Sequence, residues 1–193
     1  MLPISLGVGR DSVLRALFMG AHCDDIEIGC GGTLQRLVGL YPKLEVHWVV
    51  FSGSGSREKE AKRSAACYLE GVQCKEVVVE NFRNGYFPYI GGAIKDYFED
   101  IKHKFAPDII FTHYRDDLHQ DHRVISDLTW NTFRNHTILE YEIPKYDGDL
   151  GSPNLFVTIS KQECERKIER LKRFFNSQAE KHWFEDELFY SLM

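Results

Sequence analysis

The sequence lacks features that define several large classes of protein. None of its apolar runs approaches the roughly 18 residues needed to cross a bilayer, and a run such as 46–51 has only the length of a strand. Its 24 Lys and Arg against 29 Asp and Glu give a net charge of −5, without the basic excess that a phosphate-tracking surface requires. We therefore expect neither a membrane span nor a nucleic-acid partner.

The cysteines do not form a recognisable framework. There are five of them, an odd number with no CxxC pair, which is typical of reduced thiols rather than of disulfides. No basic segment followed by an apolar core opens the chain, so the sequence predicts no signal peptide and a cytoplasmic location. The length and the absence of repeats or linkers predict a single domain over residues 1–193, and the sequence is compatible with a homo-oligomer.

Short apolar runs alternate with helical patterns along the chain. Strands are predicted at 16–21, 44–51, 76–79 and 108–112, and helices at 33–40, 57–69, 93–105 and 124–133. This alternation favours a Rossmann-like three-layer α/β sandwich with a mostly parallel sheet in the order 3-2-1-4-5. Two late strands are expected at 137–143 and 155–159, toward the sheet edge. A final helix begins at a capping box formed by Ser160 and Glu163.

Histidine and aspartate are concentrated in two segments. Residues 20–27 (GAHCDDIE) follow the first predicted strand, and residues 113–122 (HYRDDLHQDH) follow the fourth. In an open α/β sheet, ligands bind outside the carboxyl ends of the strands where the strand order reverses, so these segments should face each other. Histidine and carboxylate without paired cysteines indicate a catalytic zinc site that keeps one position open for water.

The spacing suggests a ligand set. His22 and Asp25 lie three residues apart in one turn and can both reach a single metal, with His122 from the facing segment as a third ligand. The glycines at 29, 31 and 32 are expected to let the chain fold closely around the ion. A bound zinc ion would lower the pKa of a water molecule toward 7. Another divalent metal is also compatible with these ligand types.

The remaining side chains suggest acid–base chemistry. Asp24 is the candidate general base, since it is adjacent to the proposed ligands and free to point elsewhere. His119 could stabilise a developing oxyanion or protonate a leaving amine, provided that Asp121 or Asp117 holds it oriented and charged.

These residues resemble a known family. The segment around His22 is similar to the Ala-His-Pro-Asp-Asp-x-Glu signature of the LmbE/PIG-L zinc-dependent de-N-acetylases, and residues 119–122 are similar to that family's His-x-Asp-His motif. Further similarities are Arg57 with Glu60, the segment 82–85, and 175–178 in the predicted final helix. The likeness spans about residues 15–180.

The resemblance implies specific roles. His22, Asp25 and His122 would bind zinc, Asp24 would be the general base, and His119 would stabilise the tetrahedral intermediate. Asp121 would support His119, while Arg57 and Asn84 would contact the substrate. The implied activity is removal of an N-acyl group, most simply acetyl, from an amino sugar or sugar conjugate such as an N-acetylglucosamine derivative, by zinc-activated water.

Several residues have two interpretations. Cys23 replaces the family's proline and is either an adventitious metal ligand or, as we favour, a small core residue. Glu27 is either a hydrogen-bond partner behind the metal or a helix N-terminal charge. His113 and Asp116 are expected to support their loop rather than to bind metal. The aromatic residues 86, 87 and 89 either floor a sugar pocket or pack in the core.

Two alternative functions are also compatible with the sequence. Gly53 and Gly55 follow a strand and precede a helix, which is the position of a dinucleotide fingerprint. Glu58 stands where its third glycine would be, so a nucleotide-dependent transferase is only weakly indicated. The other alternative is a catalytically silent metal- or sugar-binding module of the same fold.

Overall fold

A computed structural model describes residues 12–193, so the expected absence of a signal peptide concerns residues 1–11, outside the described part. The strands are β1 (Leu14–His22), β2 (Leu44–Ser52), β3 (Cys74–Val79), β4 (Ile109–His113) and β5 (Thr137–Tyr141). The α-helices are α1 (Asp25–Leu40), α2 (Gly55–Tyr68), α3 (Gly91–Lys104), α4 (Gln120–Thr132), α5 (Lys161–Phe174) and α6 (Asp186–Tyr190). Two short 3-10 turns are η1 (Phe87–Tyr89) and η2 (Asn176–Gln178).

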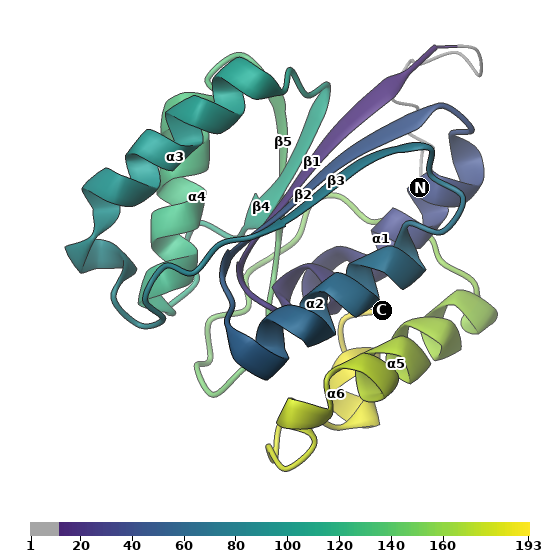
Figure 1. The fold of residues 1–193 in the computed structure, drawn as a ribbon. Helices are drawn as coiled ribbons and strands as arrows, with labels where there is room; N and C mark the ends of the chain where they lie inside the picture. The colour runs from purple at the N-terminus through teal and green to yellow at the C-terminus, as the bar shows by residue number, and fades with distance from the viewer. Residues whose placement is uncertain (1–11) are drawn as a thin grey trace.

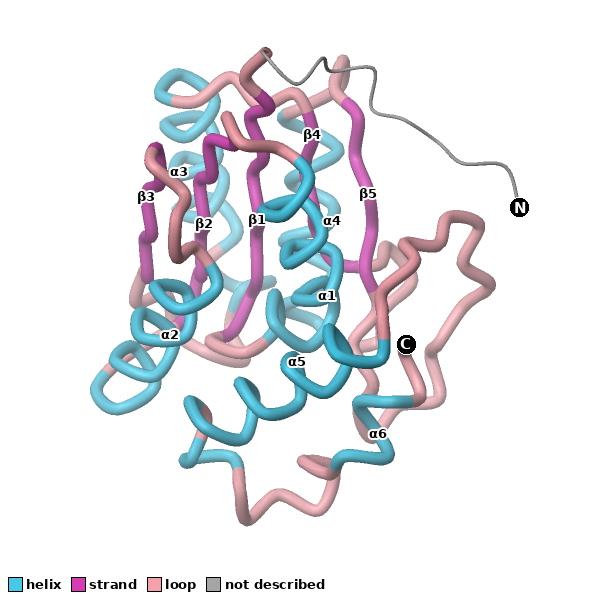
Figure 2. Tube along the Cα trace, turned by 90° about the vertical axis from the view of Figure 1, so that its right-hand side faces the viewer, coloured by secondary structure: helices cyan, strands magenta, loops and turns pink. Residues whose placement is uncertain are grey.

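The five strands form one sheet in the order β3-β2-β1-β4-β5, and every neighbouring pair is parallel, which confirms the predicted fold class. Helices α3 and α4 cover one face, while α1, α2 and α5 cover the other (Figure 1). Figure 2 shows β3 and β5 at the two edges of the sheet. Strands β1 and β4 are direct neighbours, so the loops that follow them emerge side by side.

Alternation along β1 builds the two core layers. Ala16 and Phe18 point into the layer beneath α1, α2 and α5, whereas Leu17 and Met19 point toward α3 and α4. All four side chains are fully buried, as expected for a central parallel strand covered on both faces.

The glycines after His22 do not form the turn that the sequence predicted. They lie inside α1, which begins already at Asp25 and has a non-helical residue at Cys30. A β-carbon on Gly29 would stand 2.1 Å from the Tyr141 ring, and one on Gly31 would stand 3.0 Å from the Tyr68 hydroxyl. These glycines therefore allow the helix to approach its neighbours closely rather than allowing a loop to wrap around a metal.

Two further predictions about the carboxyl-terminal half are wrong. The strand predicted at 155–159 is absent: residues 142–160 contain no regular secondary structure, and 150–158 are all exposed. A strand needs a hydrogen-bonding neighbour, and within the described chain this segment has none. The last long helix begins at the predicted capping box but ends at Phe174, so Ser177 and Gln178 lie in η2.

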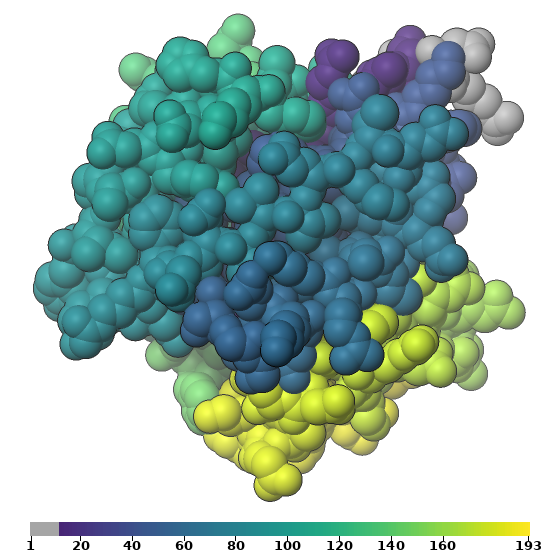
Figure 3. Space-filling model, viewed as in Figure 1, coloured from purple at the N-terminus to yellow at the C-terminus, as the bar shows by residue number. Residues whose placement is uncertain are grey.

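The carboxyl-terminal segment packs directly below α2 (Figure 3). Helix α5 contacts both α1 and α2, and its buried Ile168 and Leu171 join the core layer on that face. No helix within residues 12–193 combines the length and the apolarity required to span a bilayer.

Candidate active site

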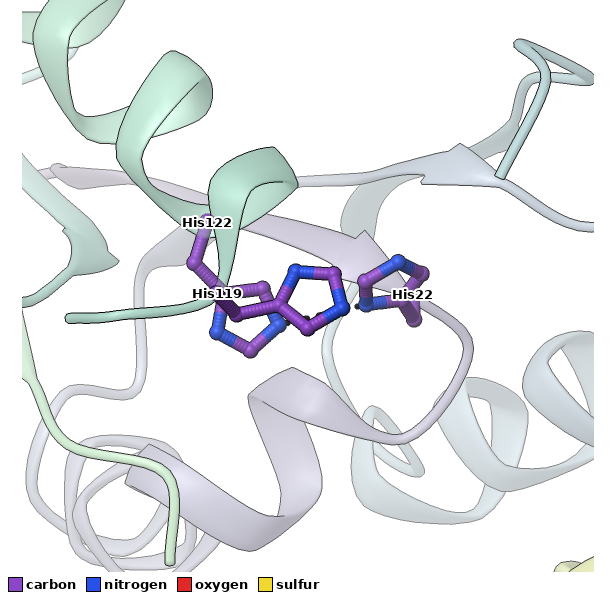
Figure 4. A group of neighbouring side chains, drawn as sticks. All are labelled: His22, His119 and His122. Carbon is purple, nitrogen blue, oxygen red and sulfur yellow. Dashed lines mark hydrogen bonds between the residues drawn. The ribbon is translucent and has the colours of Figure 1, made fainter. Parts of the chain in front are cut away.

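The two segments rich in histidine and aspartate meet at the carboxyl end of the sheet. His22 ends β1, Asp25 opens α1, and His119 and His122 lie at the start of α4. Figure 4 shows the three imidazole rings close together, with His22 facing His122. The predicted convergence of these segments is confirmed, because β1 and β4 are adjacent and parallel.

The three predicted ligands form a compact triangle of donor atoms. Nδ1 of His22 lies 3.2 Å from Nε2 of His122, and Oδ2 of Asp25 lies 3.4 Å from the first nitrogen and 3.5 Å from the second. A tetrahedral zinc site with bonds of 2.0–2.1 Å has edges of about 3.3–3.4 Å. The donor spacing therefore fits a zinc ion bound by all three residues.

Carboxylates hold both imidazoles from behind. Nε2 of His22 lies 3.3 Å from the Asp121 carboxylate, and Nδ1 of His122 lies 2.9 Å from that of Asp117. When each distal nitrogen donates its proton to its carboxylate, the two facing nitrogens present lone pairs to each other and to Asp25. Lone pairs and a carboxylate at this distance repel unless a cation lies between them, so the donor set itself fits a metal.

The pKa values of the metal-free cluster also indicate that it requires a positive charge. Burial lowers the pKa of His22, but the Asp25 and Asp121 carboxylates outweigh it and raise the pKa to about 10. Burial lowers the pKa of His122 to about 4, although the Asp25 and Asp117 carboxylates oppose this effect. His122 is thus neutral at pH 7, as a ligand must be, while a proton on His22 supplies the positive charge that the cluster requires.

The side chain of His113 also lies next to that of Asp25. Its donor atom groups with those of Asp25 and His122, all within 4.8 Å of one another. However, its Nε2 accepts a hydrogen bond of 2.9 Å from the backbone N–H of Ala21, which occupies the lone pair that a ligand would use. This geometry agrees with the expectation that His113 supports the loop. Asp116 also points away from the cluster, toward the Tyr114 hydroxyl.

Asp24 lies on the other side of the turn from the proposed ligands. Its Oδ1 accepts a hydrogen bond of 2.9 Å from the Arg57 guanidinium, and no hydrogen bond within residues 12–193 engages Oδ2. Burial raises the pKa of Asp24 above its ordinary value, and the Asp25 carboxylate adds to this although Arg57 opposes it. A carboxylate with one free oxygen and a raised pKa is suited to accept a proton.

His119 is the N-cap of α4, and its orientation defines its tautomer. Nδ1 accepts a hydrogen bond from the backbone N–H of Asp121, so the proton of the neutral ring resides on Nε2. Burial lowers the pKa of His119, which favours this neutral form. The side chain therefore presents an N–H donor to the cavity.

Asp121 does not contact His119 in the predicted way. Its carboxylate pairs with His22 and accepts backbone hydrogen bonds from Gly85 at 2.6 Å and from Phe87 at 3.2 Å. Only its backbone N–H reaches the His119 ring. Asp117 likewise accepts the backbone N–H of His119 rather than the ring. Asp121 thus orients His22 and holds the loop that carries Asn84, whereas Asp117 orients His122.

A cavity of about 510 Å³ opens over these residues. Besides His22, Asp24, Asp25, His119 and His122, it is lined by Arg57 and Asn84, the two predicted substrate contacts. Further lining residues come from 143–147 and from Gln178, Lys181 and Trp183. The position of Lys145 just beyond the carboxyl end of β5 could have indicated the first group. Nothing in the sequence placed the 178–183 segment there.

The structure tests the two interpretations that the sequence left open for several residues. The Cys23 thiol is buried, its pKa is raised to about 12 by that burial, and it points toward the Ser52 carbonyl at 3.4 Å, as a core residue does. Glu27 is also buried, neither of its oxygens is hydrogen-bonded, and burial raises its pKa to about 8, so it is neither a partner of the histidines nor a helix N-terminal charge at pH 7. Phe87 packs in the core and Tyr86 and Tyr89 are exposed, so none of the three lines the cavity.

Residues 17–133 match the family described as GlcNAc-PI de-N-acetylase, PIG-L. This match covers more than half of the chain and includes both histidine–aspartate segments. The chain belongs to this family.

Individual relatives agree with this membership. A relative in Escherichia coli (strain K12), the uncharacterized deacetylase YaiS, is 28% identical over 168 residues, which cover 81% of this chain and 88% of the relative. The fold is similar to that of N,N'-diacetylchitobiose deacetylase from Pyrococcus horikoshii, with a TM-score of 0.66 and 22% identity over 91% of this chain and 74% of that one. It is also similar to a zinc-inhibited form of the teicoplanin deacetylase Orf2, with a TM-score of 0.69 and 13% identity over 92% and 90% of the two chains.

Proposed function

We propose that this PIG-L family member is a zinc-dependent amidohydrolase that removes an N-acetyl group from an amino sugar or sugar conjugate. The observation that carries the proposal is the pair of carboxylate-backed imidazoles facing Asp25, with a free carboxylate oxygen and an N–H donor on the cavity side. Deacetylase relatives support the reaction class, and a zinc-inhibited relative supports the metal.

His22, Asp25 and His122 would hold the ion through Nδ1, Oδ2 and Nε2. When bound, zinc supplies Lewis acidity, which lowers the pKa of water toward 7 and polarises an amide carbonyl. Asp117 and Asp121 keep the proton of each ligand histidine on the nitrogen that points away from the ion. Other divalent metals accept the same donor set, so the metal present in the isolated protein is part of the test.

The proton transfers can be assigned to side chains at the cavity. Oδ2 of Asp24 accepts a proton as the water oxygen forms its bond to the amide carbonyl carbon. Nε2–H of His119 donates a hydrogen bond to the oxygen that becomes negatively charged. The carbon–nitrogen bond then breaks and the proton held by Asp24 passes to the departing amine, so that amide and water yield free amine and acetate.

Arg57 has two parts in this scheme. Its guanidinium holds Asp24 through Oδ1 and is itself oriented by Glu60 and the Ser177 hydroxyl, at 3.6 Å and 3.3 Å. Its place in the cavity wall with Asn84 suits contact with sugar hydroxyls. Both residues are proposed to select the substrate rather than to perform chemistry.

The experiment combines metal content with product formation. Protein purified without chelator or metal-affinity resin is analysed for bound metals, and released acetate is measured with a panel of N-acetylated sugars. We expect about one zinc per chain and acetate release from at least one sugar. His122→Ala should lose most of the metal and the activity, whereas His103→Ala, which alters an exposed histidine of α3, should retain both.

Two outcomes would contradict the proposal. Metal bound without acetate release from any sugar would favour a silent binding module. Absence of metal, even after zinc is added back, would exclude the mechanism, and a nucleotide that copurifies with metal-free protein would favour a transferase.

A further inference from the structure

Arg57 connects the proposed general base to the carboxyl-terminal part of the chain. Its Nη2 donates the hydrogen bond of 2.9 Å to Oδ1 of Asp24, and its Nη1 donates one of 3.3 Å to the Ser177 hydroxyl. The two ends of one planar guanidinium are therefore fixed by two residues that are far apart in the sequence. A lysine could not replace this contact, because its ammonium lacks the rigid fork that addresses two acceptors at once.

Glu60 holds the Ser177 end of this contact. Its carboxylate accepts two hydrogen bonds from Ser177, one of 2.9 Å from the backbone N–H to Oε1 and one of 2.6 Å from the hydroxyl to Oε2. The same Oε2 lies 3.6 Å from Nη1 of Arg57, which is three residues earlier in α2 and so on the same side of this helix. The Ser177 hydroxyl thus donates to Glu60 and accepts from Arg57, which fixes the orientation of all three groups.

The residues on either side of Ser177 hold it in place. Phe175 is fully buried, and Cζ of Arg57 lies 5.7 Å from the centre of its ring, within the range of a cation–π contact. The Gln178 side chain donates a hydrogen bond of 3.1 Å to the Ser177 hydroxyl and lines the catalytic cavity. Segment 175–178 therefore extends from the core to the cavity wall, and it contacts Arg57 through both an aromatic ring and a hydroxyl.

We infer that Glu60 and Ser177 are positioning residues for the general base and act through Arg57, an inference that rests on the proposed function. A freely rotating Asp24 carboxylate would exchange its two oxygens, whereas an Arg57 fixed at Oδ1 leaves Oδ2 as the proton acceptor. Catalysis is sensitive to such placement, since a shift of about 1 Å can cost about 10²-fold in rate.

The location of the two residues predicts which kinetic constant they affect. Neither Glu60 nor Ser177 is among the residues that line the cavity, so neither is expected to touch the substrate. Loss of their contacts with Arg57 should disturb the orientation of Asp24 and leave the proposed zinc ligands intact. Such a change lowers kcat much more than it raises KM.

The test measures both constants for zinc-loaded Glu60→Gln and Ser177→Ala, with the panel sugar from which the wild type releases acetate fastest. We expect kcat to fall about 10–100-fold in both variants, with a far smaller change in KM and an unchanged zinc content. Ser177→Thr retains the hydroxyl and should restore most of the lost kcat. The matched control is Glu58→Gln on the same helix, whose carboxylate pairs with Lys62, and it should behave as the wild type.

A second measurement does not depend on the activity. In a ¹H–¹⁵N NMR spectrum of the zinc-loaded protein at low temperature, the Nη protons of Arg57 should exchange slowly with solvent, because both ends of the guanidinium are hydrogen-bonded. The signals are identified by their loss in Arg57→Lys. We expect Ser177→Ala to accelerate this exchange and Ser177→Thr to preserve the slow rate.

Three results would overturn the inference. The first is wild-type kcat in both Glu60→Gln and Ser177→Ala, and the second is a rise in KM with unchanged kcat, which would place the two residues in substrate binding. The third is an unchanged exchange rate of the Arg57 protons in Ser177→Ala. If the wild type releases no acetate from any sugar, the proposed function fails, and the Arg57 protons then decide separately whether Ser177 fixes the guanidinium.

Discussion

Asp117 connects the proposed metal site to the stability of the fold, and its replacement tests both. Its carboxylate is buried and accepts three hydrogen bonds, from His122 Nδ1 at 2.9 Å, the backbone N–H of His119 at 2.7 Å and the Lys145 ammonium at 3.0 Å. Asp117→Asn keeps the size of the side chain but removes its charge and one of its acceptor oxygens. We expect weaker metal binding and a less stable protein.

The size of the stability change follows from the pKa of Asp117. Burial alone would raise it, but His122 and Lys145 lower it from the ordinary 3.8 to about 2. A difference of nearly two units corresponds to about 2 kcal/mol of stabilisation. Because the folded-state pKa is the lower one, this stabilisation is complete above about pH 4 and is lost as the pH falls toward 2. Asp117→Asn should therefore unfold about 2 kcal/mol more easily at pH 7.

The metal affinity should fall as well. Loss of a carboxylate behind a ligand histidine typically weakens metal binding by about 10–100-fold, because the imidazole loses its fixed orientation and tautomer. Urea unfolding of the metal-free protein measures the stability, and competition with a zinc chelator measures the affinity. Asp127→Asn, an exposed position on α4, is the control and should change neither quantity. Wild-type zinc affinity in Asp117→Asn would refute the assignment of His122 as a ligand held by this carboxylate.

Three further substitutions, the last with a matched control, separate the roles within the site and the fold. Asp24→Asn should retain metal while kcat for acetate release falls about 10²–10⁴-fold, and wild-type turnover would exclude Asp24 as the base. His119→Ala should lower kcat by about 10²–10³-fold without loss of zinc. Because the donor atoms of His22, His119 and His122 also lie within 4.8 Å of one another, loss of zinc in His119→Ala would instead make His119 a ligand. Gly29→Ala places a methyl group against Tyr141 and should reduce the free energy of unfolding by about 1–3 kcal/mol in a urea titration. Gly39→Ala in the same helix meets open space and should raise it by somewhat less than 1 kcal/mol; equal effects would contradict the packing argument.

Local sequence patterns were sufficient for the order of the elements and the location of the site. The alternation of apolar runs and helical patterns predicted the parallel sheet, because it reflects central strands buried on two faces, and the strand order was the one usual for such folds. His22 and Asp25 share one turn, and the parallel topology brings His122 opposite them. The predicted ligand triangle follows from these rules without any knowledge of side-chain packing.

Patterns failed where the conformation depends on a distant neighbour. Gly29 was expected in a loop, but the ring of Tyr141, which is distant in sequence, is what requires a glycine inside α1. Residues 155–159 have a strand's composition and remain unpaired, because a strand exists only when another strand accepts its hydrogen bonds. Neither partner can be read from the local sequence.

The carboxylates of the site best illustrate what the sequence determined and what only the tertiary structure determined. The sequence by itself determined which residue types stand at the ends of β1 and β4, and hence that a metal-type cluster forms there. Only the tertiary structure decided that Asp121 orients His22, that Asp117 orients His122, and that residues 178–183 wall the cavity. The physical reason is that hydrogen bonds of about 3 Å depend on the relative positions of loops and helices, whereas the alternation of strands and helices is visible in patterns of burial that repeat along the chain.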